Sequence, residues 1–206
     1  MFVKVCGLST TESVEAAVAA GADALGFVLT SSPREVSADT ARTLLDVVPP
    51  EVAAVGVFRD EPIEDALAAV KEAGLDWIQL HGNRSTRDVA AAHEAKLRVI
   101  RAVTMADDDA AFASMGEDIL LVDSAVPGSG ESWDYSSVRD RIGDNNENHD
   151  GVARRWLLAG GLHADNVAHA AHAAHAWGVD VSSGVESSRG IKDVERIRDF
   201  VHAAKG

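Results

Sequence analysis

The only cysteine of the 206 residues stands at the end of the first apolar run. Residues 2–6 read as a β-strand, in which alternate side chains put Lys4 and Cys6 on one face and Val3 and Val5 on the other. A thiol at a strand exit, with a cation on the same face, suits a general base once it loses its proton. A lone cysteine is also typical of a buried structural residue. Its surroundings must therefore decide between these two roles.

Other predicted strands carry polar side chains on one face. Because alternate residues of a strand share a face, Gln79 lies on the same face as His81, Leu121 on the same face as Asp123, and Asp180 on the same face as Ser182. In a sheet buried on both sides such groups are costly unless they are paired, so we expect them to share one interior. We expect Arg101 to face inward as well and to form a deeper polar layer with Lys4, Gln79 and Asp180. That layer is either part of a site or a purely structural set of ion pairs.

Asp123 is the candidate partner of Cys6. A carboxyl and a thiol across one mouth suit a general acid and a general base that act on two atoms of one substrate. Locally, an aspartate before the glycine-rich loop at residues 124–130 is also typical of a turn-initiating residue.

Two glycine-bearing loops close the chain and predict a phosphate site. Gly160 and Gly161 follow one predicted strand, and Ser182, Ser183 and Gly184 follow the next. Exposed backbone N–H groups and serine hydroxyls together cradle phosphate, although each loop alone could be an ordinary turn.

The elements that must position these residues alternate along the chain. The predicted strands are residues 2–6, 22–28, 52–58, 76–80, 97–103, 118–122, 155–159 and 179–182. The predicted helices are residues 11–20, 38–47, 62–73, 86–95, 107–115, 135–142, 164–177 and 191–204. Eight such repeats predict an α/β fold, a parallel eight-stranded (β/α)₈ barrel whose strand ends carry the site.

We expect a single barrel domain over residues 1–206, with a polar surface insertion near residues 143–153. An open doubly wound sheet is the alternative. No Gly-x-Gly-x-x-Gly motif follows an early strand, so a dinucleotide site is not supported.

Composition narrows the class of protein. A net charge of −14 with five lysines argues against nucleic-acid binding, which needs a basic surface. No apolar run approaches the roughly 20 residues of a membrane span, and one cysteine fits a reducing compartment, so we expect a cytoplasmic protein without membrane contact. The acidic surface also suggests a protein suited to high salt.

Six segments resemble the phosphoribosylanthranilate isomerase family, in the right order and over nearly the whole chain. They are Lys4-Val5-Cys6-Gly7-Leu8, Gly26-Phe27-Val28 with Ser32-Pro33-Arg34, Val55-Gly56-Val57-Phe58, Gln79-Leu80-His81-Gly82, Leu158-Ala159-Gly160-Gly161-Leu162, and Val179-Asp180-Val181-Ser182-Ser183-Gly184-Val185-Glu186. The resemblance implies a barrel enzyme without cofactor or metal. It would convert N-(5'-phosphoribosyl)anthranilate to 1-(2-carboxyphenylamino)-1-deoxyribulose 5-phosphate by an Amadori rearrangement in tryptophan, hence aromatic amino-acid, biosynthesis.

The resemblance also implies a role for each matching residue. Cys6 would be the general base and Asp123 the general acid. Arg34 would bind the anthranilate carboxylate, with His81 on that side, and Asp180 would meet a sugar hydroxyl. The phosphate would lie on Gly160, Gly161, Ser182, Ser183 and Gly184. The partner is then a small phosphorylated substrate, and the chain would act as a monomer or a homodimer.

One departure from the family concerns the loop after Asp123. A lysine is usual there, whereas this chain has Glu131. Two alternatives stay open: a non-catalytic barrel that binds a sugar phosphate, and a dual-substrate isomerase that also serves histidine biosynthesis. The latter enzymes rely on paired aspartates, so Cys6 favours the narrower activity.

Overall fold

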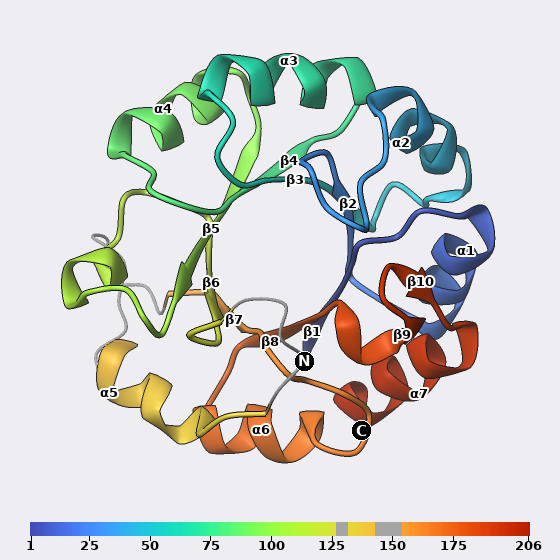
Figure 1. Cartoon of the computed structure of the whole chain (residues 1–206), viewed down its shortest axis with the longest axis vertical. Helices are drawn as coiled ribbons and strands as arrows, with labels where there is room; N and C mark the ends of the chain where they lie inside the picture. The colour runs from blue at the N-terminus through green and yellow to red at the C-terminus, as the bar shows by residue number, and fades with distance from the viewer. Residues whose placement is uncertain (127–131, 143–153) are drawn as a thin grey trace.

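The computed structural model describes residues 1–126, 132–142 and 154–206, and its strands close into one parallel barrel (Figure 1). The strands follow chain order, and β1 pairs with both β2 and β8. They are β1 (Phe2–Cys6), β2 (Ala24–Val28), β3 (Ala53–Phe58), β4 (Trp77–Leu80), β5 (Arg98–Thr104), β6 (Ile119–Asp123), β7 (Trp156–Leu158) and β8 (Gly178–Val181). The eight predicted strands and the barrel are confirmed, and the open sheet is excluded.

Helices form a ring outside the strands (Figure 1). They are α1 (Thr11–Ala20), α2 (Ala38–Leu44), α3 (Ile63–Ala73), α4 (Thr86–Glu94), α5 (Val138–Ile142), α6 (Val167–Ala174) and α7 (Val194–Lys205). Short 3-10 turns add η1 (Leu45–Val47), η2 (Asp109–Phe112), η3 (Tyr135–Ser137) and η4 (Ser183–Val185). The polar insertion predicted near residues 143–153 lies outside the described residues.

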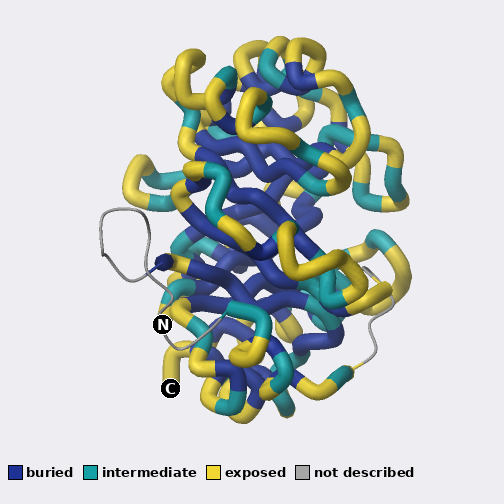
Figure 2. The backbone as a smooth tube through the Cα atoms, turned by 90° about the vertical axis from the view of Figure 1, so that its left-hand side faces the viewer, coloured by how far each residue is buried: buried dark blue, intermediate teal, exposed yellow. Residues whose placement is uncertain are grey.

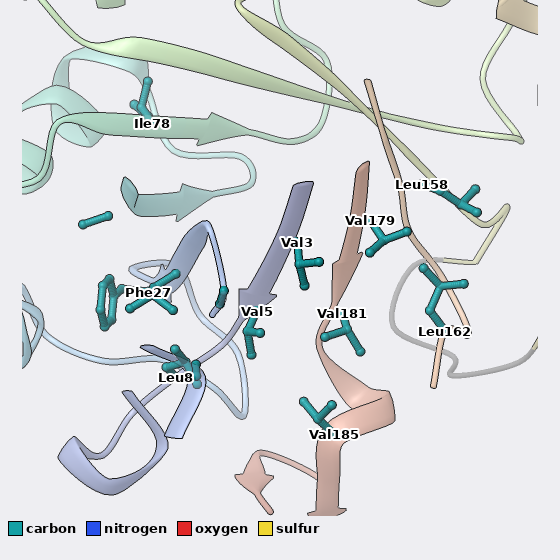
Figure 3. Packing of buried hydrophobic residues seen from close by; sticks show 14 of the residues in the cluster. Val3, Val5, Leu8, Phe27, Ile78, Leu158, Leu162, Val179, Val181 and Val185 are labelled. Carbon is teal, nitrogen blue, oxygen red and sulfur yellow. The ribbon is translucent and has the colours of Figure 1, made fainter. Parts of the chain in front are cut away.

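Strand alternation divides the buried residues into two clusters. Cys6, Val57, Ala102 and Leu121 belong to a cluster inside the barrel. A larger cluster fills the space between strands and helices, and there Val3 and Val5 of β1 lie beside Val179 and Val181 of β8 (Figure 3). Figure 2 shows the result: the segments at the centre of the molecule are mostly buried, and the exposed residues lie mainly in the outer segments. The position predicted for Val3 and Val5, on the face of β1 opposite Lys4 and Cys6, is confirmed.

The segment after β5 corrects two predictions. No long helix forms over residues 107–115, where the only helical element is the 3-10 turn η2. Arg101 faces outward, not into the barrel, and donates to the carbonyl oxygens of Ala111 and Ala113, each at 2.8 Å, and to Glu117 at 3.2 Å. Arg154 also pairs with Glu117. Arg101 shares the outer face of β5 with Val99 and Val103, and the carbonyl groups of the irregular segment provide its acceptors there.

The end of the chain contains a feature that the sequence did not predict. A helix was expected from residue 191, but residues 186–192 form a hairpin of β9 (Glu186–Ser188) and β10 (Ile191–Lys192), and α7 begins at Val194. Asp193 caps α7 by accepting from the N–H groups of Glu195 and Arg196. The hairpin brings Glu186 and Lys192 toward the mouth of the barrel.

Candidate active site

A pocket opens at the carboxyl ends of the strands and contains most of the predicted site residues. Its walls include Cys6 from β1, Arg34 after β2, His81 after β4, Asp123 at the end of β6, and Asp180 and Ser182 of β8 and its loop. The inward-facing ends of four strands thus meet at one mouth, as parity predicted.

Cys6 lies inside the barrel, 6% exposed. Burial raises the pKa of its thiol above the ordinary value, Lys4 and Lys192 act in the opposite direction, and Asp180 adds to the rise. In the free protein the thiol is therefore the dominant form at neutral pH.

Lys4 is fully buried beneath the pocket and donates to Asp180 Oδ1 at 2.7 Å. Burial alone would lower the pKa of Lys4, but the carboxylate of Asp180 and the nearby Cys6 raise it. Lys4 therefore stays charged, and the polar layer predicted from parity consists of Lys4, Gln79 and Asp180 without Arg101.

Asp123 lies in the same pocket with its Oδ1 atom accepting from Ser124 N at 2.8 Å. Burial raises the pKa of this carboxyl to about 6, against the hydrogen bond from Ser124, and the negative charge of Asp180 adds to the rise. A carboxyl with this pKa still carries its proton in a fraction of molecules near neutral pH and can act as a general acid. The bond from Ser124 N also fits the turn-initiating role. Asp123 therefore stabilises the start of the loop and lines the pocket as well.

His81 is neutral at working pH. Its Nε2 atom lies 2.6 Å from Gln79 Nε2, and burial with the charges of Lys4, Arg59 and Arg84 lowers its pKa to about 3. His81 thus offers hydrogen bonds and a ring surface rather than a charge.

Arg34 is held by a carboxylate that sequence reasoning missed. Its Nε and Nη2 atoms donate to the two oxygens of Glu186 at 2.6 and 3.1 Å. Lys192 Nζ donates to Glu186 Oε1 at 2.9 Å and to the carbonyl oxygen of Ser182 at 2.8 Å. Against the effect of burial, these bonds lower the pKa of Glu186 to about 2. Glu186 is the last residue of the sixth segment that resembles the family, but no role was predicted for it, and nothing in the sequence placed Lys192 beside it.

Arg59 is a second missed residue. It follows β3, lines the same pocket and is exposed. Within the described ranges, no carboxylate pairs with its guanidinium, whose charge acts on both His81 and Asp123.

A second, smaller pocket adjoins the first at the loops after β7 and β8. Gly160, Gly161, Ser182 and Ser183 line it, together with Asp123 and Asp180. Among the backbone hydrogen bonds outside helices and strands in the described residues, none has the N–H of Gly161 or Ser183 as its donor. Gly184 lines neither of these two pockets. Its α-carbon packs so closely on the Leu162 carbonyl that a Cβ atom would clash.

In the loop after Asp123 this chain has Glu131 where the family usually has a lysine. Residue 131 lies outside the described residues. Among the residues that are described, no three His, Cys, Asp or Glu side chains gather into a potential metal site.

Comparison with known proteins identifies the family. The family profile described as N-(5'phosphoribosyl)anthranilate (PRA) isomerase matches residues 3–203. The chain belongs to this family. It is 37% identical over 203 residues to N-(5'-phosphoribosyl)anthranilate isomerase from Streptococcus mutans, and the alignment covers 98% of each protein.

Solved structures agree with the family assignment. A crystal structure of TrpF from Jonesia denitrificans is 42% identical, has a TM-score of 0.84, and aligns over 100% of this chain and 97% of that one. A phosphoribosyl anthranilate isomerase in complex with reduced 1-(o-carboxyphenylamino)-1-deoxyribulose 5-phosphate is 32% identical, with a TM-score of 0.84 and coverage of 100% and 99%. The resemblance that the motifs indicated is confirmed.

Proposed function

We propose that this protein is an isomerase of tryptophan biosynthesis that converts N-(5'-phosphoribosyl)anthranilate to 1-(2-carboxyphenylamino)-1-deoxyribulose 5-phosphate. The observation that carries the proposal is the shared pocket of Cys6 and Asp123, which belong to β1 and β6 of a barrel from this family. A base and an acid on well-separated strands suit a reaction that moves protons at two atoms of one substrate.

The acid step opens the sugar ring. Asp123 gives its proton to the furanose oxygen while the bond from that oxygen to C1' breaks. The lone pair of the anthranilate nitrogen forms the new C=N bond, so the product of this step is an iminium ion. The raised pKa of Asp123 supports this role, because a carboxyl with a pKa of about 6 carries a proton in a useful fraction of molecules near neutral pH.

The base step uses the iminium as an electron sink. The Cys6 thiolate takes the proton from C2', the C–H electrons form a C1'=C2' double bond, and the C=N electrons return to nitrogen. The resulting enolamine gains a proton at C1' and loses the hydroxyl proton at C2', which gives the ketone. The substrate's own nitrogen thus supplies the electron sink for these proton transfers.

The ends of the substrate fit the two sides of the site. Arg34 retains Nη1 for the anthranilate carboxylate beside the neutral ring of His81, since its Nε and Nη2 atoms are bound to Glu186. We assign the phosphate to the N–H groups of Gly160, Gly161, Ser183 and Gly184 and to the hydroxyls of Ser182 and Ser183. Asp180, fixed by Lys4, would receive a sugar hydroxyl.

The decay of anthranilate fluorescence on addition of pure protein tests the proposal. We expect rapid loss of substrate with wild type. Cys6→Ser and Asp123→Asn should each lower kcat by about 10²–10⁴-fold while they retain substrate binding, as removal of a general base or acid does.

The same assay separates the alternatives. Binding without turnover by wild type would leave a non-catalytic sugar-phosphate protein, and turnover of the histidine-pathway substrate as well would identify a dual-substrate isomerase. An active Cys6→Ser variant would remove Cys6 from the base role.

The setting of the enzyme is a further part of the proposal. Within the described residues, each helix is too short or too polar to cross a membrane. We propose a cytoplasmic enzyme whose partner is its small phosphorylated substrate, acting as a monomer or a homodimer. Cell fractionation and light scattering of the pure protein distinguish these possibilities.

A further inference from the structure

The end of β1 lies between two ammonium groups. Lys4 shares the inner face of β1 with Cys6, and its ammonium group acts on the thiol. Lys192 approaches from the β9–β10 hairpin at the mouth, where 2% of its side chain is exposed. Since the mechanism above needs a thiolate at Cys6, the position of this second cation matters.

Lys192 lies against the turn that follows Cys6. A Cβ atom added to Gly7, the next residue, would be 3.3 Å from Lys192 Nζ and 3.2 Å from Ser182 Oγ. The same Cβ atom would lie 2.7 Å from Arg34 Cδ, so the absence of a side chain at Gly7 lets Arg34, Ser182 and Lys192 pack closely against this turn. Cys6 and Lys192 are close enough for the charge of each to act on the pKa of the other.

The ammonium of Lys192 is fixed by its neighbours. Its Nζ atom lies 2.8 Å from the Ser182 carbonyl oxygen, 3.2 Å from Ser182 Oγ and 2.9 Å from Glu186 Oε1. The other oxygen of Glu186 accepts from the N–H of Gly190 at 3.0 Å and from Arg34. With its three hydrogens directed at these acceptors, Lys192 acts on Cys6 through its charge rather than through a hydrogen bond.

The charges around the end of β1 sum to a positive value. Lys4, Lys192 and Arg34 contribute three positive charges, and Asp180 and Glu186 contribute two negative ones. Across the pocket His81 is neutral, Asp123 is protonated in the working form, and Arg59 adds a further positive charge. A thiolate is therefore formed in a locally positive site although the whole chain carries a net charge of −14.

We propose that Lys192 is a positioning residue of the reaction: its ammonium group, held by Glu186 and Ser182, stabilises the Cys6 thiolate and sets the pH at which the base forms. Its catalytic meaning rests on the proposed isomerase function. The effect on the thiolate is a property of the free protein.

Alkylation by iodoacetamide, followed by mass spectrometry over a range of pH, tests this directly. Cys6 is the only cysteine, so the rate reports on its thiolate alone. We expect Lys192→Gln to slow alkylation about tenfold at pH 8 and to move the profile to higher pH, as loss of a nearby positive charge does. Lys192→Arg should remain close to wild type.

Lys205→Gln is the matched control. It removes the same charge from an ammonium that pairs with Asp23 at 2.8 Å, on the side of the barrel where β1 and β2 begin. It should alkylate as wild type does, and circular dichroism should show native folding in all variants. An unchanged profile in Lys192→Gln, or equal slowing in Lys205→Gln, would overturn the inference. Failure of the proposed function looks different, because wild type would then alkylate as expected but leave the substrate unconsumed.

Discussion

Cys6 and Asp123 hold their protons in the opposite order from the one that the proposed reaction uses. Asp123 has a pKa of about 6 and burial raises that of Cys6 above its usual value, so most molecules at neutral pH have a carboxylate and a thiol. The working form has a protonated acid and a thiolate. Between the two pKa values its population is small but constant, because gain of thiolate with rising pH offsets loss of the acid's proton.

This order predicts a bell-shaped dependence of kcat/KM on pH. The acidic limb should lie near pH 6, because below this pH Asp123 is already protonated and no longer offsets the fall in thiolate with falling pH. The alkaline limb should follow Cys6 and lie above the ordinary pKa of a free thiol. Stopped-flow fluorescence from pH 5 to 10.5 measures both limbs, and an acidic limb near pH 4 would contradict the assignment to Asp123.

The raised pKa of Asp123 also predicts a conflict between activity and stability. The folded protein binds this proton more tightly than the unfolded chain, so the stability from the protonated carboxyl is full below about pH 4 and is lost as pH rises through about 6. Asp123→Asn should therefore be inactive yet more stable than wild type at pH 8, by up to about 2–3 kcal/mol.

Urea unfolding at pH 8 and at pH 4 checks this. The difference between variant and wild type should be near zero at pH 4, where both side chains are neutral. A variant less stable than wild type at pH 8 would show that the carboxylate is well solvated in the native state.

At the scale of elements, the sequence predicted those parts of the fold that depend on local pattern. Strand alternation placed Cys6, His81, Asp123 and Asp180 at one mouth because each strand is buried on both faces. The same rule gave the wrong face for Arg101. Alternation alone does not say which face of a strand is the inner one, and a long charged side chain can lie outside the barrel where carbonyl oxygens accept its hydrogen bonds. The contact of Glu186 with Arg34 joins residues 152 positions apart, and no spacing rule reveals such a pair.

The loops after β6 and β7 are tightly interlocked, which gives a test at this scale. Gly160 has φ +85°, and a Cβ atom there would lie 2.7 Å from both Asp123 Oδ1 and Ser124 N. Gly160→Ala should lose stability by about 1–3 kcal/mol and should also lower kcat, because Asp123 must move.

Gly116→Ala provides the comparison for Gly160→Ala. Gly116 has φ +93° but no atom within 4 Å of the added Cβ, so this variant should show only the conformational cost, about 1 kcal/mol, with kcat unchanged. Thermal unfolding and kcat are measured for both. Equal kcat values in the two variants would mean that the Gly160 contact does not hold Asp123 in place.

At the scale of the whole molecule, charge sets the conditions for stability. The 33 acidic residues outnumber the 19 lysines and arginines, and the folded state brings these carboxylates close together. Salt screens this repulsion over distances beyond about 10 Å at 0.1 M, whereas close buried pairs such as Lys4 with Asp180 are screened much less.

The midpoint of urea unfolding should therefore rise between low salt and 1 M KCl. A parallel series in a neutral osmolyte at matched water activity separates screening from general solvent effects. An equal or higher midpoint at low salt would contradict the idea of a protein suited to high salt.

Barrel closure has a consequence for how the enzyme is made. β1 pairs with β8, and the two ends of the chain lie close together in both views (Figures 1 and 2). Cys6 is translated well before Ser182, Glu186 and Lys192. Until β8 and the β9–β10 hairpin have been made, the nascent chain carries Cys6 and Lys4 without the neighbouring strand and without the ammonium group of Lys192. The site is complete only after residue 192 has been translated.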